Sequence, residues 1–576
     1  MSIEKIIESK ICKLCSVKFE ITDKDLEFYD KISPVFNGQK FQISAPTLCP
    51  DCRQQRRLAF RNERKLYKRK CDLCDKNMIS IYSPDYDGRV YCNSCYRSDN
   101  WNPFSYAKKY DCSKTFFEQF QELYKNVPKL GLNIGVNMEN CDYNNHIGYS
   151  NNCYLCFGVS NCDNCFYVHK SSLIENSIDI SNSDSIIKSY FVIDSSNIYG
   201  SFFIEKSANI SESYFINSCE NIQNGIFCVN MKNKKYVYKN KEISHEEYKK
   251  ILALLKEKLK SHAGLIFLQK EFDDFKKQFP IPSLNISNSE NCLGDNISNS
   301  KNCVNCFGII NSEDCTYVYD TGGANDCMDM NFSGNIGERQ TYSFELIAGA
   351  GGNRVYFSEN IFGNMRNIFY CSGCFNNSED LFGCVDLKNK HYCILNKQYS
   401  KEEYEIEVSK IIQKMEQTGE WGEFFPASIS PFGYNETVAF ENFPMVKDGA
   451  ISKGYKWQDK DYPVNIPANI EIIKSKDLPD NLDNIDESIL NKAISCENSK
   501  RLFRLMKSEL VFYKLNGIAL PRLHPDERQN KRISLFKSGK LKEGKCFKCN
   551  KDIISSYLDG KGKNVFCEEC YKKELM

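Results

Sequence analysis

The sequence predicts a mainly β protein in which cysteine-rich ribbons at both termini flank two β-solenoid blocks, each closed by an α-helix. Two observations lead to this fold class. Pairs of cysteines recur near both ends of the chain with one spacing, and the middle of the chain advances in twelve-residue steps. A fixed period with stacked apolar and small positions is typical of solenoid repeats.

The ribbons are predicted from cysteine spacing. Cys71-x2-Cys74 and Cys92-x2-Cys95 are seventeen residues apart, and the same seventeen residues separate Cys546-x2-Cys549 from Cys567-x2-Cys570. Four thiolates carried as two pairs on facing hairpins suit a tetrahedral zinc ion. The flanking residues repeat as well: Lys76, Ile79, Ser80, Tyr82, Val90 and Tyr96 correspond to Lys551, Ile554, Ser555, Tyr557, Val565 and Tyr571.

A second zinc site is expected upstream of the first ribbon, where the C-terminal copy has lost its ligands. The positions that match the upstream cysteines are Cys496, Ser499, His524 and Glu527. Because ligands that were lost together served one ion, the upstream four form one site. We therefore predict three zinc sites and one decayed copy, and Cys496, His524 and Glu527 stay open as a fourth site. The predicted ligands are Cys12, Cys15, Cys49 and Cys52; Cys71, Cys74, Cys92 and Cys95; and Cys546, Cys549, Cys567 and Cys570.

The first repeat block extends from about Ile147 to Asn230. Its seventh position is small, and its fourth and tenth positions are mostly aliphatic. Short β-prone runs broken by Ser-Asn or Asp turns favour a β-solenoid. Two repeats per coil would give about 24 residues and a core wide enough for Tyr and Phe, whereas one repeat per coil would leave a very narrow core.

A second, less regular block extends from about Asn288 to Leu387, with cysteines every twelve residues at Cys303, Cys315 and Cys327. Both blocks end in the same sequence pattern, which predicts a hairpin followed by a capped helix. The predicted caps are Ser244 with Glu247 and Ser400 with Glu403. The predicted apolar helix faces are Tyr248, Ile251, Leu255 and Leu259, and Tyr404, Val408, Ile411 and Met415. We expect each helix to seal the open end of its solenoid.

These elements give the following domain order. We expect a tandem zinc-ribbon module at 1–100, a linker helix at 101–130, a first solenoid block at 135–243, capping helices at 244–280, a second solenoid block at 285–399, a capping helix at 400–420, an irregular linker at 421–490, and a second zinc-ribbon module at 491–576.

Several cysteines inside the blocks also have metal-like spacing. They occupy repeat positions that are Ser, Val or Ile elsewhere, so we favour small buried side chains over a further metal or redox site. The residues are Cys153, Cys156, Cys162, Cys165, and the pairs Cys303/Cys306 and Cys371/Cys374.

A basic segment joins the two N-terminal zinc sites and is the best functional clue in the sequence. Nine cations with interleaved Phe60 and Tyr67 predict a surface for phosphates and unpaired bases. The alternative is an ordinary solvated face. The nine residues are Arg53, Arg56, Arg57, Arg61, Arg64, Lys65, Lys68, Arg69 and Lys70, and Arg53 and Arg57 recur as Arg528 and Arg532.

Signatures of catalysis are few. The Gly349–Gly352 run lacks the context of a nucleotide loop and is expected to form a turn. Asp179, Asp184 and Asp194 occupy turn-like positions in the first block and are expected to have structural roles. Glu205 and Glu212 are expected to face solvent. The formal net charge is +1, and the sequence shows no signal peptide and no apolar run of membrane-spanning length. Thirty cysteines in such a chain indicate a reducing cytosol.

The motif Leu48-Cys-Pro-Asp-Cys-Arg53, with the run Arg57–Cys71 behind it, resembles a large uncharacterised bacterial family of multi-zinc-ribbon proteins with a repeat-containing centre. Phe116–Phe120, Trp421–Pro426 and Ser430–Thr437 resemble it too. The resemblance covers nearly the whole chain, and it implies zinc binding and no established activity. The sequence departs from the family pattern at Ser499, His524 and Glu527.

Together these observations predict a cytosolic, non-enzymatic adapter. It would bind nucleic acid, RNA before DNA, through the ribbons and protein partners through the solenoid, with no membrane association. The first alternative is a purely protein–protein scaffold with structural zinc. The second is a carbohydrate-active β-solenoid enzyme, which would require a pair of acids in a groove. The oligomeric state is left open.

Overall fold

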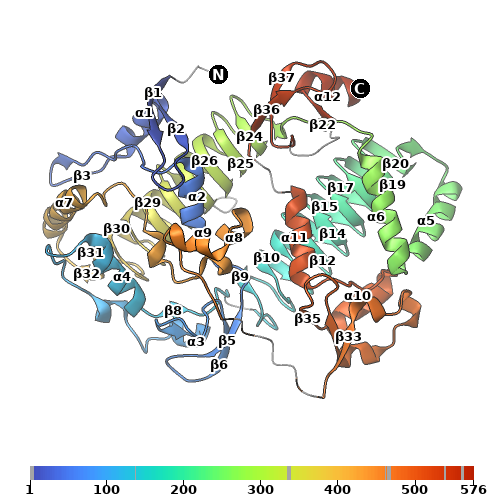
Figure 1. Cartoon of the computed structure of the whole chain (residues 1–576), viewed down its shortest axis with the longest axis horizontal. Helices are drawn as coiled ribbons and strands as arrows, with labels where there is room; N and C mark the ends of the chain where they lie inside the picture. The colour runs from blue at the N-terminus through green and yellow to red at the C-terminus, as the bar shows by residue number, and fades with distance from the viewer. Residues whose placement is uncertain are drawn as a thin grey trace. The chain divides into compact units, whose positions relative to one another are not determined.

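The computed structural model describes residues 5–135, 138–333, 339–460, 462, 467, 469–536, 540–558 and 564–575. It divides into two compact units, and each draws on both halves of the chain. The first unit comprises Met1–Leu132 and Leu284–Asp461, and the second comprises Asn133–Ser283 and Tyr462–Met576. The N-terminal ribbon module thus shares a unit with the second repeat block, and the C-terminal module with the first. Strands predominate, which confirms the mainly β class (Figure 1).

The first repeat block belongs to the second unit and consists of parallel strands, with one antiparallel strand at its end. Nine of its parallel strands form a closed path, β12-β14-β16-β18-β19-β17-β15-β13-β11, because β11 also pairs with β12. The bounds are β9 Asn145–Gly148, β10 Phe157–Asp163, β11 His169–Glu175, β12 Ile178–Ser181, β13 Asp184–Ile187, β14 Tyr190–Ile193, β15 Ser196–Tyr199, β16 Phe202–Glu205, β17 Ala208–Ser211, β18 Tyr214–Asn217, β19 Glu220–Val229, β20 Lys232–Tyr238 and β21 Lys241–Glu242.

The register of these strands settles the repeat length. Ile186 lies opposite Ile198, and Ile198 lies opposite Ile210, so stacked positions are twelve residues apart. The expectation of about 24 residues between stacked positions is therefore wrong. The twelve-residue alternative, with its narrow core, agrees with the pairing.

A shorter period underlies the twelve-residue one. The backbone is left-handed at every third residue from His146 to Lys239, and only Gly158 and Gly200 among these are glycines. A residue with a Cβ atom pays roughly 1–2 kcal/mol of backbone strain in this conformation, whereas glycine does not. Hydrogen bonds between repeats oppose this cost: the amides of Lys188 and Glu212 donate to carbonyls thirteen residues earlier, each at 3.0 Å.

The interior of this block accepts only small and aliphatic side chains. Ile186, Ile198 and Ile210 are fully buried in one column of stacked side chains. A parallel column of serines links the repeats, because the amide of Ser201 donates to Oγ of Ser189 at 3.2 Å and the amide of Ser213 donates to Oγ of Ser201 at 3.0 Å. Inward positions therefore alternate between aliphatic and small polar residues every third residue.

The aromatic residues of this block lie outside the narrow interior. Phe203 and Phe215 stack with ring centroids 4.6 Å apart, and Phe215 contacts Phe227 and Phe272. Phe272 belongs to α6 (His262–Lys276), which covers this face together with α5 (His245–Leu259) (Figure 1). The wider coil was expected in order to bury Tyr and Phe, but helices bury these rings instead.

The second repeat block, in the first unit, follows the same plan less regularly. Cys315 lies opposite Cys327, twelve residues on, but Met328 lies opposite Phe344 because extra residues are inserted between them. The run Gly349–Gly352 lies inside strand β29, so the expected turn is absent there. The bounds are β23 Ile286–Ser287, β24 Leu293–Ser298, β25 Val304–Ile310, β26 Glu313–Gly322, β27 Ala324–Ser333, β28 Gln340–Thr341, β29 Phe344–Phe369, β30 Glu379–Phe382, β31 His391–Ile394 and β32 Lys397–Gln398.

The predicted block endings are confirmed. Antiparallel pairs β20–β21 and β31–β32 form the hairpins. Helix α7 (Lys401–Thr418) has a complete capping box between Ser400 and Glu403. At the start of α5 the Glu247 amide donates to the Ser244 side chain, but the predicted return bond from the Glu247 side chain is not formed. The predicted apolar faces are buried, except that Ile251 is half-buried.

The remaining elements belong to the ribbon modules and the segments that join them. In the first unit these are β1 Ile6–Ile11, β2 Lys18–Thr22, α1 Asp23–Ile32, β3 Val35–Phe36, β4 Gln39–Lys40, α2 Pro50–Leu58, β5 Tyr67–Lys70, β6 Asn77–Ser80, β7 Val90–Tyr91, α3 Asn93–Tyr96, α4 Phe116–Asn126, β8 Lys129–Leu130, α8 Val438–Asn442 and α9 Lys447–Ser452. In the second unit they are β22 Ile281–Pro282, β33 Glu471–Lys474, β34 Lys492–Ser495, β35 Leu502–Phe503, α10 Lys507–Asn516, α11 Pro525–Phe536, β36 Lys542–Lys545, β37 Asp552–Ser555, β38 Val565–Phe566 and α12 Glu568–Leu575.

We predict that Phe215→Ala destabilises the second unit by about 3–5 kcal/mol, because the ring is fully buried between two neighbours in the sheet and α6. Leu173→Ala is the matched control, since Leu173 also has a left-handed backbone but is exposed. Urea unfolding followed by circular dichroism measures both. Equal losses for the two variants would show that the outer ring cluster does not stabilise the sheet.

Candidate metal centres and buried arginine contacts

Each of the three predicted cysteine sets comes together in the structure. In every set the four Sγ atoms lie within 4.8 Å of one another. Each site combines a turn after a strand with the start of a helix: Cys49 caps α2, Cys92 caps α3, and Cys567 immediately precedes α12. The three groups are Cys12, Cys15, Cys49 and Cys52; Cys71, Cys74, Cys92 and Cys95; and Cys546, Cys549, Cys567 and Cys570.

Backbone amides point at the sulfur atoms in both ribbons. The amide of Cys92 donates to Sγ of Cys71 at 3.2 Å, and the amide of Cys567 donates to Sγ of Cys546 at 3.3 Å. Burial alone would raise the pKa of Cys546, but hydrogen bonds from the Cys567 and Cys549 amides outweigh it and lower the pKa to about 6. The turn thus favours the thiolate, which is the form that binds metal.

The donor set indicates the kind of site. Four sulfur ligands converging on one point favour a tetrahedral ion such as zinc. They also leave no open position for water or substrate, as in structural rather than catalytic zinc sites. The three groups are therefore suited to hold the fold rather than to carry out a reaction.

The decayed copy keeps its fold without forming a comparable centre. The amide of His524 donates to Sγ of Cys496 at 3.2 Å, in the manner of the intact ribbons. In the part of the chain that the structure describes, however, Cys496, His524 and Glu527 do not form a fourth group of converging ligands. His524 instead accepts a hydrogen bond from the Asp526 amide at Nδ1.

The cysteines within the blocks are placed as core side chains. Cys153 donates to the carbonyl of Asn151 at 3.2 Å, and Cys165 donates to that of Asp163 at 3.1 Å. Ser189 makes the same bond, to the carbonyl of Ile187, at an equivalent position. Over residues 138–333 and 339–460, no further group of converging metal ligands includes a block cysteine. This supports the packing interpretation for Cys156, Cys162, Cys303, Cys306, Cys371 and Cys374 as well.

The basic segment does not form the expected surface. Arg53, Arg56 and Arg57 lie on α2 and are buried, and the side chain of Arg57 is 0% exposed. Their guanidinium groups face acids of the second repeat block, Asp329 and Glu345. The prediction that these three arginines bind phosphate is wrong, because the protein's own carboxylates neutralise them in the interior.

The contacts of α2 form one network. Nε of Arg53 lies 2.7 Å from Asp329, while Nη1 of Arg57 lies 3.0 Å from Glu345 and 3.4 Å from Asp329. Arg56 bridges Glu345 at 3.2 Å and Glu423 at 3.0 Å. Burial alone would lower the pKa of Arg53, but Asp329 and the other groups around it outweigh burial and raise it.

The other six predicted residues divide into two groups. Arg61 pairs with Glu63 at 2.5 Å, Arg64 lies 3.8 Å from Glu441, and Arg69 pairs with Asp72 at 2.9 Å. Lys65, Lys68 and Lys70 are exposed. Only the tertiary structure decides which cations become buried. The sequence alone therefore did not separate the paired arginines from the exposed lysines.

The second unit repeats the arginine contact. On α11, Arg528 lies 2.6 Å from Asp179, and Arg532 pairs with the same carboxyl group. The ring of Tyr167 lies 4.3 Å from the Arg528 guanidinium, as Tyr317 lies 5.6 Å from that of Arg53. The recurrence of Arg53 and Arg57 as Arg528 and Arg532 thus marks an equivalent contact. Burial raises the pKa of the neighbouring Glu509 to about 6 against the lowering effect of Arg528.

At one position the arginine networks of the two units differ, and there both contacting residues are different. Counted from Cys71 and Cys546, Arg56 corresponds to Lys531. Arg56 pairs with Glu345, whereas the Lys531 ammonium lies 6.0 Å from the ring centroid of Phe191. An ion pair in one unit is therefore replaced by a cation–ring contact in the other.

Each ribbon makes a second contact with its repeat block, and here too the charged residues of one unit are replaced together in the other. The Tyr96 hydroxyl donates to Asp386 at 2.6 Å, and the Tyr571 hydroxyl donates to Asn230 at 3.2 Å. Asp386 also faces buried Lys129, 3.8 Å away, on the strand that pairs with Val90. In the second unit, uncharged Ile281 takes the place of Lys129 opposite Val565, and Asn230 takes the place of the acid.

The acidic residues of the first block have structural roles in the interior or at the surface. Asp179 receives the two arginines, Glu205 lies 3.1 Å from Lys276, and Asp194 accepts from Asn182 at 2.8 Å. Asp184 accepts from Ser172, while Glu212 is exposed, as expected. Glu205 was expected to face solvent, and the ion pair corrects this.

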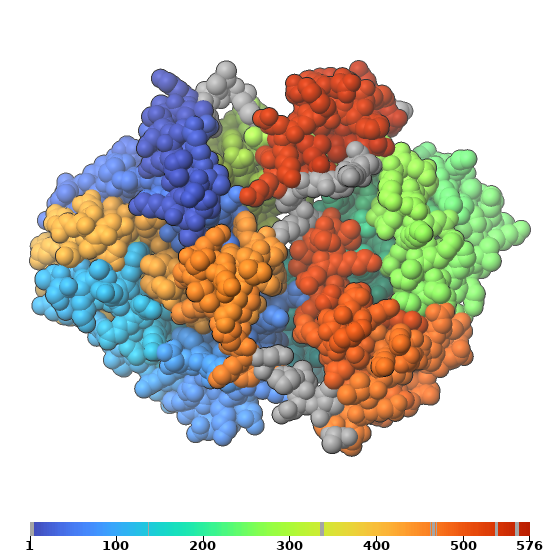
Figure 2. Space-filling view, viewed as in Figure 1, coloured from blue at the N-terminus to red at the C-terminus, as the bar shows by residue number. Residues whose placement is uncertain are grey.

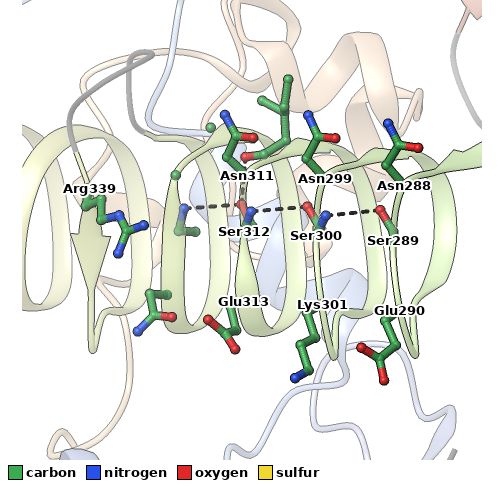
Figure 3. Close-up of a pocket in the computed structure, with 15 residues that line it drawn as sticks. Asn288, Ser289, Glu290, Asn299, Ser300, Lys301, Asn311, Ser312, Glu313 and Arg339 are labelled. Carbon is green, nitrogen blue, oxygen red and sulfur yellow. Dashed lines mark hydrogen bonds between the residues drawn. The ribbon is translucent and has the colours of Figure 1, made fainter.

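A groove on the second block contains two further acids, as Figure 3 shows. Its floor is a serine ladder in which the amide of Ser300 donates to Ser289 at 3.0 Å and that of Ser312 donates to Ser300 at 3.1 Å. Glu290 and Glu313 are on its wall, but Lys301 lies between them in register. The intervening cation separates the two carboxylates, so the groove gives no support to the paired acids of a glycosidase.

Comparison with known proteins adds no relative: no family model, no curated protein and no solved structure matches the chain. No helix among the described residues has the length and apolar character needed to cross a membrane.

We predict that the protein binds three zinc ions and that Cys71→Ser or Cys546→Ser reduces this to two, because each removes one ligand of a closed site. Cys165→Ser is the control, since that thiol packs in the interior and serine occupies equivalent positions. Plasma mass spectrometry of purified protein measures the metal. Loss of an ion from the control would assign metal to the block cysteines.

We predict that Arg57→Met lowers the free energy of unfolding of the first unit by about 3–5 kcal/mol, because the buried network of Glu345 and Asp329 loses one of its compensating positive charges. Arg532→Met is expected to do the same to the second unit through Asp179. Lys68→Met is the exposed control and is expected to change stability by less than about 0.5 kcal/mol. Denaturant unfolding measures all three, and a small loss in Arg57→Met would contradict the buried contact.

Proposed function

We propose that the protein is a non-enzymatic scaffold in which zinc has a structural role. The observation that carries this proposal is the buried arginine contact between a ribbon-module helix and a repeat block, which occurs in both units. The second unit keeps this contact even though its equivalent metal ligands have changed. Attachment of module to block is therefore the property common to both copies, and metal is one means of stabilising it.

We infer that each repeat block is a β-solenoid with one twelve-residue repeat per turn. Three features support this: parallel pairing to the residue twelve positions on, left-handed residues at every third position, and hydrogen bonds between successive repeats. The capped helices α5 and α7 follow the last hairpins, where they would protect the end of each solenoid. Such stacks present long surfaces that suit protein partners.

The resemblance to multi-zinc-ribbon proteins remains our proposal, carried by the motif Leu48–Arg53. Location in the cytosol is also proposed. None of the thirty cysteines forms a disulfide, and this number of reduced cysteines persists in a reducing compartment.

Nucleic-acid binding is the second candidate function, and three residues favour it. Lys65, Lys68 and Lys70 remain exposed, and Lys68 and Lys70 lie on the outward face of β5. Three cations support only weak, salt-sensitive contact with phosphates. The six arginines of the segment are engaged within the protein, so a scaffold with structural zinc is the better-supported function.

We predict that the full-length protein shows no saturable affinity for single-stranded RNA at physiological salt, because its basic segment is neutralised internally. Filter binding across a salt series measures this. The variant Lys65→Glu/Lys68→Glu/Lys70→Glu tests the exposed cations, and Lys249→Glu, in an exposed position of α5, is the control.

Affinity that persists at physiological salt and disappears only in the triple variant would overturn the scaffold proposal in favour of an RNA adapter. Charge reversal at Arg56 or Arg57 is unsuitable as a test of RNA binding, because both side chains are buried and their replacement disturbs folding.

A further inference from the structure

The outer edge of β1 is unpaired in the part of the chain that the structure describes. Strands β1 and β2 form a two-stranded antiparallel sheet by themselves. Their atoms form part of the visible surface of the dark-blue N-terminal segment (Figure 2). Such an edge offers a row of backbone donors and acceptors to another chain.

The equivalent sheet of the second unit has an additional strand. Counted from Cys12 and Cys496, β1 corresponds to β34 and β2 to β35. The pairs Lys10–Phe19 and Ile494–Phe503 occupy the same register position. On the other side of β34, β33 pairs in parallel and covers the edge that is open in β1.

The direction of the amides supports an equivalent site on β1. The amide of Cys12 donates to the carbonyl of Val17, toward β2, just as that of Cys496 donates to Arg501, toward β35. Because amides alternate along a strand, those of Ser9 and Ile11 point to the open edge. Their equivalents, Ala493 and Ser495, lie opposite Ile472 and Lys474 of β33.

The exposed apolar side chains also lie at this edge. Ile7 and Ile11 of β1 are 48% and 62% exposed. Val17, just beyond the turn, is 57% exposed. A cluster of exposed β-branched residues beside an unpaired edge is a feature that native proteins usually avoid unless another chain covers it.

We propose that the edge of β1 from Glu8 to Ile11 binds an extended segment of a partner protein as a parallel strand. The second unit carries an internal example of the occupant, Glu471-Ile-Ile-Lys474. Glu471 pairs with Lys492 at 3.0 Å, and the position of Lys492 corresponds to Glu8. The partner segment therefore has β-branched residues next to a basic residue that faces Glu8.

This site names the class of partner that the proposed scaffold would bind. The inference rests on the proposed function only because it requires a protein partner. The proposed function is tested by RNA affinity, whereas the edge is tested by peptide binding. The two can fail independently.

The test uses full-length protein and a fluorescein-labelled peptide with the sequence of residues 469–476 carrying Glu471→Lys, followed by fluorescence anisotropy. We expect saturable binding of this peptide and weaker binding of the unchanged peptide, whose glutamate would face Glu8. In the protein variant Glu8→Lys we expect this preference to reverse, because the charge opposite residue 471 is inverted.

Ser9→Pro is the blocking variant. Proline removes an amide that points to the open edge without removing a bond to β2, so we expect at least a tenfold loss of affinity, while Ser9→Ala retains it. Unfolding curves show whether Ser9→Pro is folded, and the charge reversal in Glu8→Lys tests the site separately.

Absence of binding, or equal binding to Ser9→Pro and Ser9→Ala, would overturn the proposal. A concentration-dependent dimer in sedimentation that Ser9→Pro abolishes would also overturn it, since the occupant would then be a second copy of the chain.

Discussion

The structure depends on the burial of two arginines of one helix against carboxylates of a repeat sheet. Each ionised group alone would be very costly to bury, so neither the helix nor the sheet is stable in this form without the other. In the first unit Arg53 and Arg57 meet Asp329 and Glu345, and in the second Arg528 and Arg532 meet Asp179. The contact fixes which module joins which block, and it does so across the chain, because the N-terminal module belongs with the second block.

The paired differences between the units show how such contacts tolerate change. Lys129 and Asp386 form a buried charged pair, and burial lowers the pKa of Lys129 and raises that of Asp386. The second unit has Ile281 and Asn230 instead, with the tyrosine hydrogen bond retained. Both partners are replaced together because a single remaining charge would be buried without compensation. The metal ligands around Cys496 in the second unit are replaced without a comparable penalty, because the apolar contacts around that site remain.

The narrow repeat interior explains the distribution of side chains. Columns of isoleucine, serine and cysteine fill the space inside, where thiols make the same hydrogen bonds as serine hydroxyls. Rings that do not fit inside stack along the outer face under helices. The left-handed residues at every third position allow this shape, and their strain is offset by hydrogen bonds between repeats and by burial of the rings.

The sequence by itself determined the three cysteine centres, the twelve-residue period and the capped helices after each block, because all of these depend on spacing or on neighbours within a few residues. A three-residue alternation of aliphatic and serine positions was also present, as in Ile186, Ser189 and Val192, and would have indicated the narrow interior. Only the tertiary structure decided which cations are buried. Arg57 and Lys68 look alike in sequence, and what separates them is an acid more than 270 residues away that comes into contact with one of them only on folding.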